Sequence, residues 1–416
     1  MFHVFHNAVA SVAKPPVLLV LISQTETSWC QQLSEEGYTV VQVPYPDAEN
    51  GDLVRNLAEA QAELLQGSEW ALVTYGLKPE DISSLTALFS STTPRACVHY
   101  CPTIEDGHGL VHEAVDGAVI PTLFHLSSKQ EVLHASLLEL AEQKSTDIPT
   151  SRFPPIAVHA YPLVPVFPPF PFLAGPPIDH ASRKVGTIGP HLRSANNLAY
   201  TRTLELLRRE LGPHFPLEKL WEKHTYYEFV ERDASKTMST MVYHLFVWLL
   251  QPLTPIPKFT QVSTPYVNHV PTMTGGVGYK DLARFYKYHF TKENVTPPDT
   301  ELITISRTVG ADRIIDEMIF KCTHTTEIDY FLPGIKPTGK PLEIALVGVV
   351  AFRGDKLTFE HIYWDQASVL VQLGLLDSTG LPVAGSEVAH KVVDPFGLPS
   401  NTLLTKWKES EGLSID

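Results

Sequence analysis

The chain has 416 residues, 44% of them hydrophobic and 19% charged, a composition typical of a globular protein long enough for two or three domains. Its 46 acidic side chains outnumber the 32 basic ones, for a formal net charge of −14, and basic residues are adjacent only in pairs. Phosphate binding needs a concentrated basic surface, so this balance argues against a nucleic-acid partner.

The cysteines and the N-terminal segment indicate the compartment. The four cysteines form neither a disulfide framework nor a spaced pair of zinc ligands, which favours a reducing environment. Residues 1–14 lack the basic flank and long apolar core of a signal peptide, and the apolar run 15–22 is too short to span a bilayer. We therefore expect a cytoplasmic protein without a membrane partner.

The first half alternates apolar runs with amphipathic stretches, which predicts strands separated by helices. The predicted strands are 17–22, 39–43, 70–75, 96–100, 118–125 and 156–161. The predicted helices are 25–36, 52–65, 79–89, 129–143 and 198–211. Apolar strands joined by helices indicate a mostly parallel sheet covered on both sides, and we expect this α/β domain to span residues 1–213.

Residues 161–177 contain so many prolines that neither a helix nor a central strand is expected there. We predict an extended surface loop, which either packs down as a connector or shields a cleft.

The second half changes character after residue 213. Helical patterns at 217–242 and 279–290 precede long strand-like runs, which indicates an α+β domain with a curved sheet. We place this domain at 214–380 and treat 381–416 as a C-terminal extension. The predicted strands are 301–307, 313–325, 341–353 and 357–365.

Residues 243–261 interrupt this domain. They are aromatic, broken by prolines and out of register with the helix before them, and removing them joins residue 242 smoothly to residue 262. We interpret the segment as an insertion, such as an unspliced intron carried into the sequence. The alternative is a genuine hydrophobic lid.

The chemistry is expected on the last strand, 357–365. Alternate side chains of a strand share a face, so His361, Tyr363 and Asp365 point the same way. An acid and an imidazole beside aromatic rings suit proton transfer on an apolar substrate. The alternatives are that His361 lies in solvent at a rim and that Asp365 only caps the following helix.

From about residue 217 to residue 377, without the inserted segment, the chain resembles the SnoaL-like polyketide cyclases of the nuclear transport factor 2-like superfamily. The resemblance rests on Tyr363-Trp-Asp365 followed by Val371-Gln-Leu-Gly374. It implies a cone-shaped α+β barrel in which Asp365 acts as acid/base on an acidic C–H or a carbonyl oxygen. It also leaves open a homodimer through the barrel sheet.

Further residues are placed toward the same cavity. On the strand 313–325, one mostly apolar face brings Asp316 and His324 inward, although a buried histidine satisfied by a neighbour is the commoner outcome. Asn268 and His269 precede a turn at the expected mouth of the barrel, where they either contact substrate or serve the turn alone. No short-spaced pair of ligands supports a metal, so none is expected.

Residues 15–211 resemble the dienelactone hydrolases, an α/β-hydrolase family, in element order and in Pro121-Thr-Leu-Phe-His125. That family implies a cysteine or serine nucleophile on a glycine-flanked turn, with an aspartate and a histidine. The matching turn, 73–78, has neither Cys nor Ser, and the positions of the other two groups lack Asp and His. The triad is therefore expected to be lost, and Cys97 and Cys101 are interpreted as loop thiols beside incidental histidines.

The sequence thus predicts a three-layer α/β-hydrolase-like sheet followed by a cone-shaped α+β barrel that holds the active site. The expected activity is cofactor-independent cyclisation, isomerisation or dehydration of a small hydrophobic carbonyl or polyketide-like compound. The alternatives are ester or lactone hydrolysis in the N-terminal domain and a non-catalytic ligand-binding or scaffold protein. The predicted site has Asp365 as the acid/base, assisted by His361 and His324, with substrate contacts from Asn268, His269, Asp316 and Tyr363.

Overall fold

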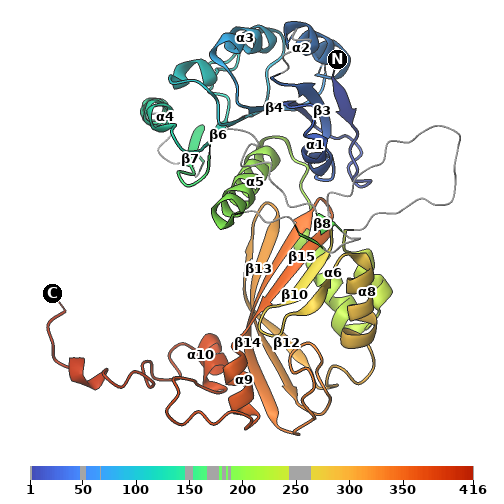
Figure 1. Ribbon diagram of the computed structural model, residues 1–416, viewed down its shortest axis with the longest axis vertical. Coiled ribbons are helices and arrows are strands. Elements are labelled where there is room, and N and C mark those ends of the chain that lie inside the picture. The colour runs from blue at the N-terminus through green and yellow to red at the C-terminus, as the bar shows by residue number, and fades with distance from the viewer. Residues whose placement is uncertain are drawn as a thin grey trace, which may run out of the picture. The chain divides into compact units, whose positions relative to one another are not determined.

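The computed structural model describes residues 2–46, 53–65, 67–145, 153–165, 178–179, 184–185, 189–242 and 264–415. They divide into two compact units, an N-terminal unit up to Phe215 and a C-terminal unit from Pro216 onward (Figure 1). The predicted insertion at 243–261 and most of the proline-rich segment lie outside the described residues. Within the described ranges, no helix is both long and apolar enough to cross a membrane.

The N-terminal unit is built on a seven-stranded sheet. Six strands are mutually parallel, and β1 pairs antiparallel at one edge. All residues of β2, β4 and β6 are buried, as is typical of parallel strands packed on both faces. The strand order is β1 (His3–Phe5), β3 (Thr39–Pro44), β2 (Val17–Ile22), β4 (Trp70–Tyr75), β5 (Cys97–Tyr100), β6 (Thr122–Leu126) and β7 (Ile156–Ala160).

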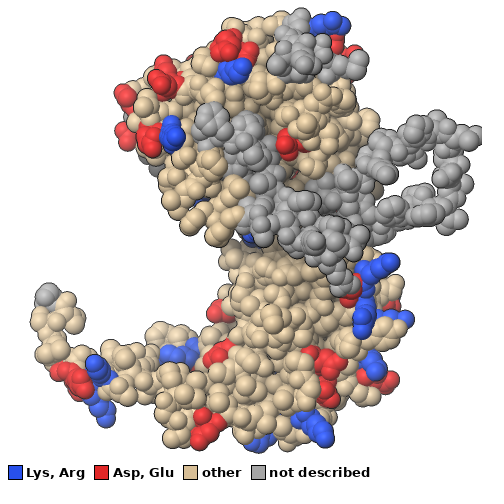
Figure 2. Space-filling view, in the orientation of Figure 1, with Lys and Arg blue, Asp and Glu red and all other residues tan. Residues whose placement is uncertain are grey.

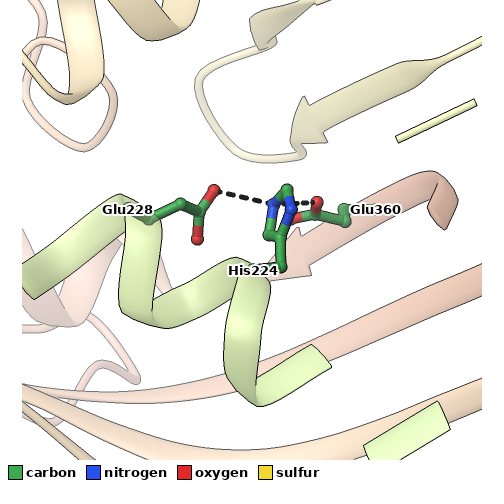
Figure 3. A group of neighbouring side chains, drawn as sticks. All are labelled: His224, Glu228 and Glu360. Atoms are coloured by element: carbon green, nitrogen blue, oxygen red, sulfur yellow. Dashed lines mark hydrogen bonds and ion pairs between the residues drawn. The ribbon is translucent and has the colours of Figure 1, made fainter. Parts of the chain in front are cut away.

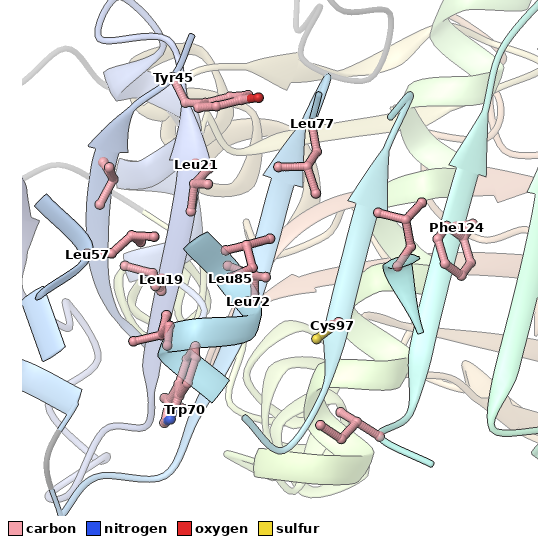
Figure 4. Close-up of a cluster of buried hydrophobic side chains, with 14 of the residues drawn as sticks. Leu19, Leu21, Tyr45, Leu57, Trp70, Leu72, Leu77, Leu85, Cys97 and Phe124 are labelled. Atoms are coloured by element: carbon pink, nitrogen blue, oxygen red, sulfur yellow. The ribbon is translucent and has the colours of Figure 1, made fainter. Parts of the chain in front are cut away.

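Helices alternate with these strands along the chain and bury apolar side chains against the sheet. In the cluster of Figure 4, Leu19, Leu72 and Phe124 come from strands, and Leu57 and Leu85 come from helices. The predicted mostly parallel sheet is therefore present, whereas its kinship with dienelactone hydrolases stays a prediction. The helical segments are α1 (Thr27–Ser34), α2 (Leu53–Ala60), η1 (Gln61–Leu65), η2 (Pro79–Asp81), α3 (Ile82–Ser91), η3 (Gly107–Leu110), α4 (Glu131–Ser145) and α5 (Pro190–Leu211), and β8 (Ile178–Asp179) pairs with β9 (Lys184–Val185).

The C-terminal unit carries a six-stranded mixed sheet, in keeping with the predicted α+β arrangement. Neighbouring strands are antiparallel except β10 and β15, which are parallel. The order is β11 (Thr274–Val277), β10 (Tyr266–His269), β15 (Lys356–Tyr363), β14 (Pro341–Arg353), β13 (Arg313–Thr323) and β12 (Glu301–Val309). The helical segments are α6 (Leu217–Thr225), η5 (Tyr226–Val230), α7 (Ala234–Ser239), α8 (Tyr279–Phe285), η6 (Tyr286–Phe290), α9 (Gln366–Gln372), α10 (Glu387–Val393) and η7 (Lys408–Ser410).

One face of this sheet is buried beneath helices, and α6 packs against both β13 and β15. Along β13 the side chains alternate as predicted, because every second residue turns to the buried face. The buried residues of that face are Ile314, Asp316, Met318, Phe320 and Cys322.

A β-bulge interrupts the alternation in β15. Leu357 pairs with Phe352 and Phe359 pairs with Ala351, so Thr358 is an extra residue without a partner on β14. An extra residue shifts every side chain that follows it to the other face of the sheet.

The bulge decides which part of β15 faces inward. Beyond it, Glu360 and Ile362 are buried, whereas His361 is half-buried and Tyr363 is exposed. The prediction that His361 and Tyr363 face the cavity was therefore wrong, because the bulge reverses the alternation on which it depended.

Candidate acid/base site

Three buried ionisable side chains meet between the helices and the sheet of the C-terminal unit (Figure 3). His224 ends α6, Glu228 follows one helical turn later on η5, and Glu360 reaches them from β15. The Nε2 atom of His224 lies 3.1 Å from Oε1 of Glu228 and 3.0 Å from Oε1 of Glu360. All three side chains are at most 5% exposed, so their charges must be balanced within the cluster.

The orientation of the imidazole is set by the hydroxyl group of Thr240. Nδ1 of His224 lies 2.6 Å from Oγ1 of Thr240, and that hydroxyl donates its own proton to the carbonyl oxygen of Thr237 at 2.6 Å. With its proton engaged there, Thr240 accepts a hydrogen bond from Nδ1–H. The other nitrogen, Nε2, is therefore the atom that takes up or releases a proton toward the carboxyl groups.

The cluster retains protons at neutral pH. Burial alone lowers the pKa of His224, but the charges of Glu228 and Glu360 outweigh burial and raise that pKa to about 10. Burial raises the pKa of Glu228, His224 opposes this, and Glu360 adds to it. The phenol of Tyr286 lies 3.3 Å from Nε2 of His224, and burial together with both carboxylates raises its pKa. An imidazolium and a carboxyl group that is protonated more easily than usual thus lie side by side.

Two members of the cluster, Glu228 and Glu360, line a cavity that contains about 470 Å³ of space between its lining atoms, open solvent included. His269 on β10 also lines it, and burial lowers the pKa of His269 to about 4, which keeps that imidazole neutral. The remaining wall is mostly apolar and aromatic, and consists of Trp221, Thr225, Phe229, Val267, Phe290, Leu302, Met318, Phe320, Tyr330, Phe331, Leu346 and Ile362.

This arrangement can move protons within an apolar cavity. A carboxylate can accept a proton from bound ligand while a neighbouring protonated carboxyl group donates one, and His224 keeps the total charge low. The three ligand atoms lie within 4.8 Å of one another, close enough for a shared proton or for a divalent cation.

The structure does not place the predicted acid/base, Asp365, at this cavity. Its side chain is exposed and accepts a hydrogen bond from the backbone N–H of Ala367 at 2.9 Å, as the N-cap of α9. The helix-cap alternative therefore describes its position. The predicted acid/base role requires the side chain of Asp365 to face the cavity, and it does not.

His361 and Tyr363 lie on the outer face of the sheet, away from the cavity. His361 packs against Tyr266 and Phe359, with ring centroids 5.2 Å and 5.0 Å apart. Asn268 pairs with His361 in the register of β10 and β15, so it also belongs to this face. In the view of Figure 2, the area over β10 and β15 carries no charged side chain.

Asp316 and His324 are buried, as predicted, but their contacts are structural. Asp316 accepts hydrogen bonds from Arg307 at 2.7 Å and 2.8 Å and from Nε1 of Trp221 at 2.8 Å. Nδ1 of His324 lies 3.1 Å from Oγ1 of Thr338. Neither residue lines the cavity, so within the described part of the chain His269 is the one predicted site residue found on its wall.

Sequence reasoning missed all three members of the cluster, although two signals were available. His224 and Glu228 have the four-residue spacing that places two side chains on one face of a helix. Glu360 is a lone acid within the apolar run 357–364, which is unusual unless the carboxyl group has a buried partner.

In the N-terminal unit, the turn that the hydrolase resemblance assigns to a nucleophile holds Gly76 at φ 65°, a residue with no side chain. Cys101 after β5 is buried, and burial raises the pKa of its thiol to about 11, although a contact with Ser127 opposes the shift. A thiol that stays protonated at neutral pH is a poor nucleophile. The turn 73–78 thus holds neither serine nor cysteine, and Cys101, which lies outside it, keeps its thiol protonated.

Comparison with known proteins gives only partial likenesses. No family model matches the chain, and no curated protein matches it. A solved structure from Catenulispora acidiphila DSM 44928, described as having a ketosteroid isomerase-like fold, is 13% identical, with a TM-score of 0.26 over 39% of this chain and 96% of that chain. A putative SnoaL-like polyketide cyclase from Jannaschia Sp. CCS1 is 13% identical, with a TM-score of 0.26 over 40% of this chain and 99% of that chain.

A third solved structure, an NTF2-like protein from Burkholderia thailandensis E264, is 12% identical, with a TM-score of 0.25 over 38% of this chain and 95% of that chain. Two of these descriptions, SnoaL-like and NTF2-like, use the same family names as the sequence resemblance. At such identities and TM-scores, nothing about the activity of this chain follows from them.

Proposed function

We propose that the C-terminal unit is a cofactor-independent acid/base enzyme for a small hydrophobic carbonyl compound. The observation that carries the proposal is a pair of buried carboxyl groups, Glu228 and Glu360, which share the imidazolium of His224 on the wall of an apolar cavity. Exposed carboxylates are weak bases, whereas a carboxyl group in an apolar site can hold or take a proton near neutral pH.

In this proposal Glu360, as the carboxylate, removes a proton from the carbon next to the carbonyl group, and the C–H electron pair forms an enolate. Glu228, whose raised pKa keeps a proton available, donates a hydrogen bond to the enolate oxygen. His224 keeps its proton on Nε2 between both carboxyl groups and offsets the charge that moves between them.

Three outcomes are open to the enolate. Isomerisation follows if the proton on Glu360 returns to a different carbon. Cyclisation follows if the enolate carbon attacks a second carbonyl carbon of the same molecule, whose oxygen then takes the proton. Dehydration follows if a β-hydroxyl group takes that proton and leaves as water.

The apolar wall supports this chemistry in two ways. It excludes water, which strengthens the hydrogen bond to the enolate oxygen and protects the intermediate. The neutral imidazole of His269 adds a polar contact without a further charge, and its Nδ1 atom lies 3.4 Å from the carbonyl oxygen of Thr274.

The test is proton exchange on a small hydrophobic ketone, beta-tetralone, in heavy water with a chelator present. Wild-type protein should speed deuterium uptake at the carbon next to the carbonyl, and Glu360→Gln should slow that catalysed rate by about 10²–10⁴-fold, the usual contribution of general acid–base catalysis. The measurement is the loss of the α-proton signal by NMR.

The matched control is Asp365→Asn, which changes a carboxyl group on the same segment and preserves a helix cap. It should retain the wild-type exchange rate. If Asp365→Asn abolishes exchange while Glu360→Gln retains it, the site is wrongly placed. If the wild-type protein binds beta-tetralone without exchange, the unit is a ligand-binding module and not an enzyme.

A further inference from the structure

A second pocket opens at the surface of the C-terminal unit, beyond the cavity. It contains about 660 Å³ of space between its lining atoms, open solvent included. We call it the outer pocket, and it is lined by Met273, Thr274, Gly275, Phe285, His289, Asp329, Pro333 and Gly334. Its lining combines the apolar side chains of Met273, Phe285 and Pro333 with polar groups of Thr274, His289 and Asp329.

The polar groups of the outer pocket include an oriented imidazole. Nδ1 of His289 lies 2.8 Å from Oδ2 of Asp329, and their side chains are 45% and 32% exposed. The carboxylate can only accept, so Nδ1 carries the proton in this contact. In the neutral imidazole, Nε2 is then a hydrogen-bond acceptor that is available to a ligand.

The rim of the outer pocket is held in place by a side-chain clamp. The hydroxyl groups of Thr272 and Thr274, on either side of the turn between β10 and β11, donate to the carbonyl oxygen of Tyr330 at 2.8 Å and 3.0 Å. Tyr330 directly follows Asp329, so the clamp also fixes the carboxylate that orients His289. A site that is already formed loses less conformational entropy on binding.

The outer pocket and the cavity are separate sites that share a thin aromatic wall. His289 lines the outer pocket and the next residue, Phe290, lines the cavity; the same holds for Asp329 and Tyr330. The ring centroids of Phe290 and Tyr330 are 4.5 Å apart, so the wall is closed between them. A ligand in the cavity therefore does not extend into the outer pocket through this wall.

We propose that the outer pocket binds an aromatic compound that carries a hydroxyl group. Nε2 of His289 accepts the hydroxyl proton as a hydrogen bond, Asp329 orients the imidazole, and the ring lies against Phe285. A ring that carries a hydroxyl group suits this pocket because Met273, Phe285 and Pro333 offer apolar contacts beside the oriented pair. This inference does not depend on the proposed chemistry at Glu360.

The test compares naphthol with methoxynaphthalene, which has the same rings but no hydroxyl proton. Wild-type protein should bind naphthol about tenfold more tightly, as measured by the change in ligand fluorescence, because one hydrogen bond in an apolar site contributes on that order. The variant His289→Ala should bind both compounds equally, at the affinity of methoxynaphthalene. His289 is half-exposed, so this variant is expected to fold.

Three further variants locate the hydroxyl group. Asp329→Ala should reduce the preference by releasing the imidazole, whereas Asp329→Asn should retain much of it, because the amide oxygen still accepts from Nδ1–H. Glu360→Gln should leave the preference unchanged. A preference that survives in His289→Ala, or one that disappears in Glu360→Gln, would place the hydroxyl group elsewhere and overturn the inference without touching the proposed enzyme.

Discussion

At the scale of single residues, the surroundings of a carboxyl group decide its role. Asp365 and Glu360 lie on one short segment of chain, yet Asp365 is exposed and tied to a helix N-terminus while Glu360 is buried against an imidazole. A carboxylate in water gains little from a nearby charge, whereas a buried one has to share a proton or an opposite charge. Of the two carboxyl groups, Glu360 is therefore the one to which we assign the proposed proton transfer.

The raised pKa of His224 predicts how stability depends on pH. Folding raises this pKa from about 6.5 to about 10, so the folded protein binds more protons than the unfolded chain between these values. The contribution is fully present below pH 6.5 and is lost as the pH rises toward 10. We expect the free energy of unfolding of the C-terminal unit to fall by up to about 1.4 kcal/mol per pH unit in this window.

This dependence can be measured by urea unfolding with pulsed thiol labelling of Cys322, which is buried in the C-terminal unit. Labelling is carried out at one fixed pH so that only the preceding equilibrium varies. In Glu360→Gln, where one of the two carboxylates is removed, the decline should end at a lower pH. Stability that rises between pH 7 and pH 9 would show that His224 is not protonated in the folded protein.

At the scale of elements, a single extra residue in β15 builds the site. Thr358 has no partner on β14, and the shift that it causes turns Glu360 toward His224 and turns His361 outward. Bulges are known to re-aim side chains next to functional sites. The regular alternation of β13, by contrast, was predicted correctly because its pairing with β14 runs without a shift.

Deletion of Thr358 should remove the bulge and disrupt the C-terminal unit. Regular pairing would turn Glu360 outward and leave His224 with one carboxylate, or else expose Leu357. We expect a loss of roughly 3–5 kcal/mol in the free energy of unfolding, the usual cost of breaking a buried ion pair. Urea unfolding measures it.

The control is Thr358→Ala, which keeps the extra residue and should cost less than about 1 kcal/mol. A deletion variant as stable as the control would mean that the bulge does not set the inward face of β15.

At the scale of the whole molecule, the fold buries histidines in two charge states. In the N-terminal unit, burial lowers the pKa of His99 to about 3 and holds that of His125 well below its usual range. In the C-terminal unit, His224 is buried as the imidazolium. Burial alone favours the neutral imidazole, and His224 is charged because two carboxyl groups lie against its Nε2 atom.

The lowered values predict acid sensitivity of the N-terminal unit. Below pH 6.5 the unfolded chain protonates these histidines and the folded unit does not, so their contribution is present above pH 6.5 and is lost as the pH falls. Each fully buried histidine contributes a slope of up to about 1.4 kcal/mol per pH unit.

Hydrogen exchange by mass spectrometry, corrected for the intrinsic rate at each pH, resolves the two units by peptide. Exchange within β4, β5 and β6 should become faster from pH 6.5 to pH 4.5, and His99→Gln should reduce this change. If protection of these strands is equal at both pH values, the two histidines are not held neutral by the fold.

Much of the architecture could be read from local pattern. Continuous apolar runs such as 17–22 and 70–75 predict buried parallel strands, and the alternation in 313–325 predicts one buried face. His269 lines the cavity, whereas its neighbour Asn268, predicted beside it, lies on the other face of the sheet. Local pattern carries this information because the side-chain period of a strand is fixed by its backbone.

The sequence by itself determined the types of element and their order: apolar strands alternating with helices in the first half, then helices followed by long strands, with an acid and a histidine on the last of them. Only the tertiary structure decided which acid. The extra residue in β15 is visible only when β14 is beside it, and the partnership of His224 with Glu360 joins positions 136 residues apart, obtained as 360 − 224. Charge balance in a buried cluster is a property of neighbours in space, and spacing along the chain does not encode it.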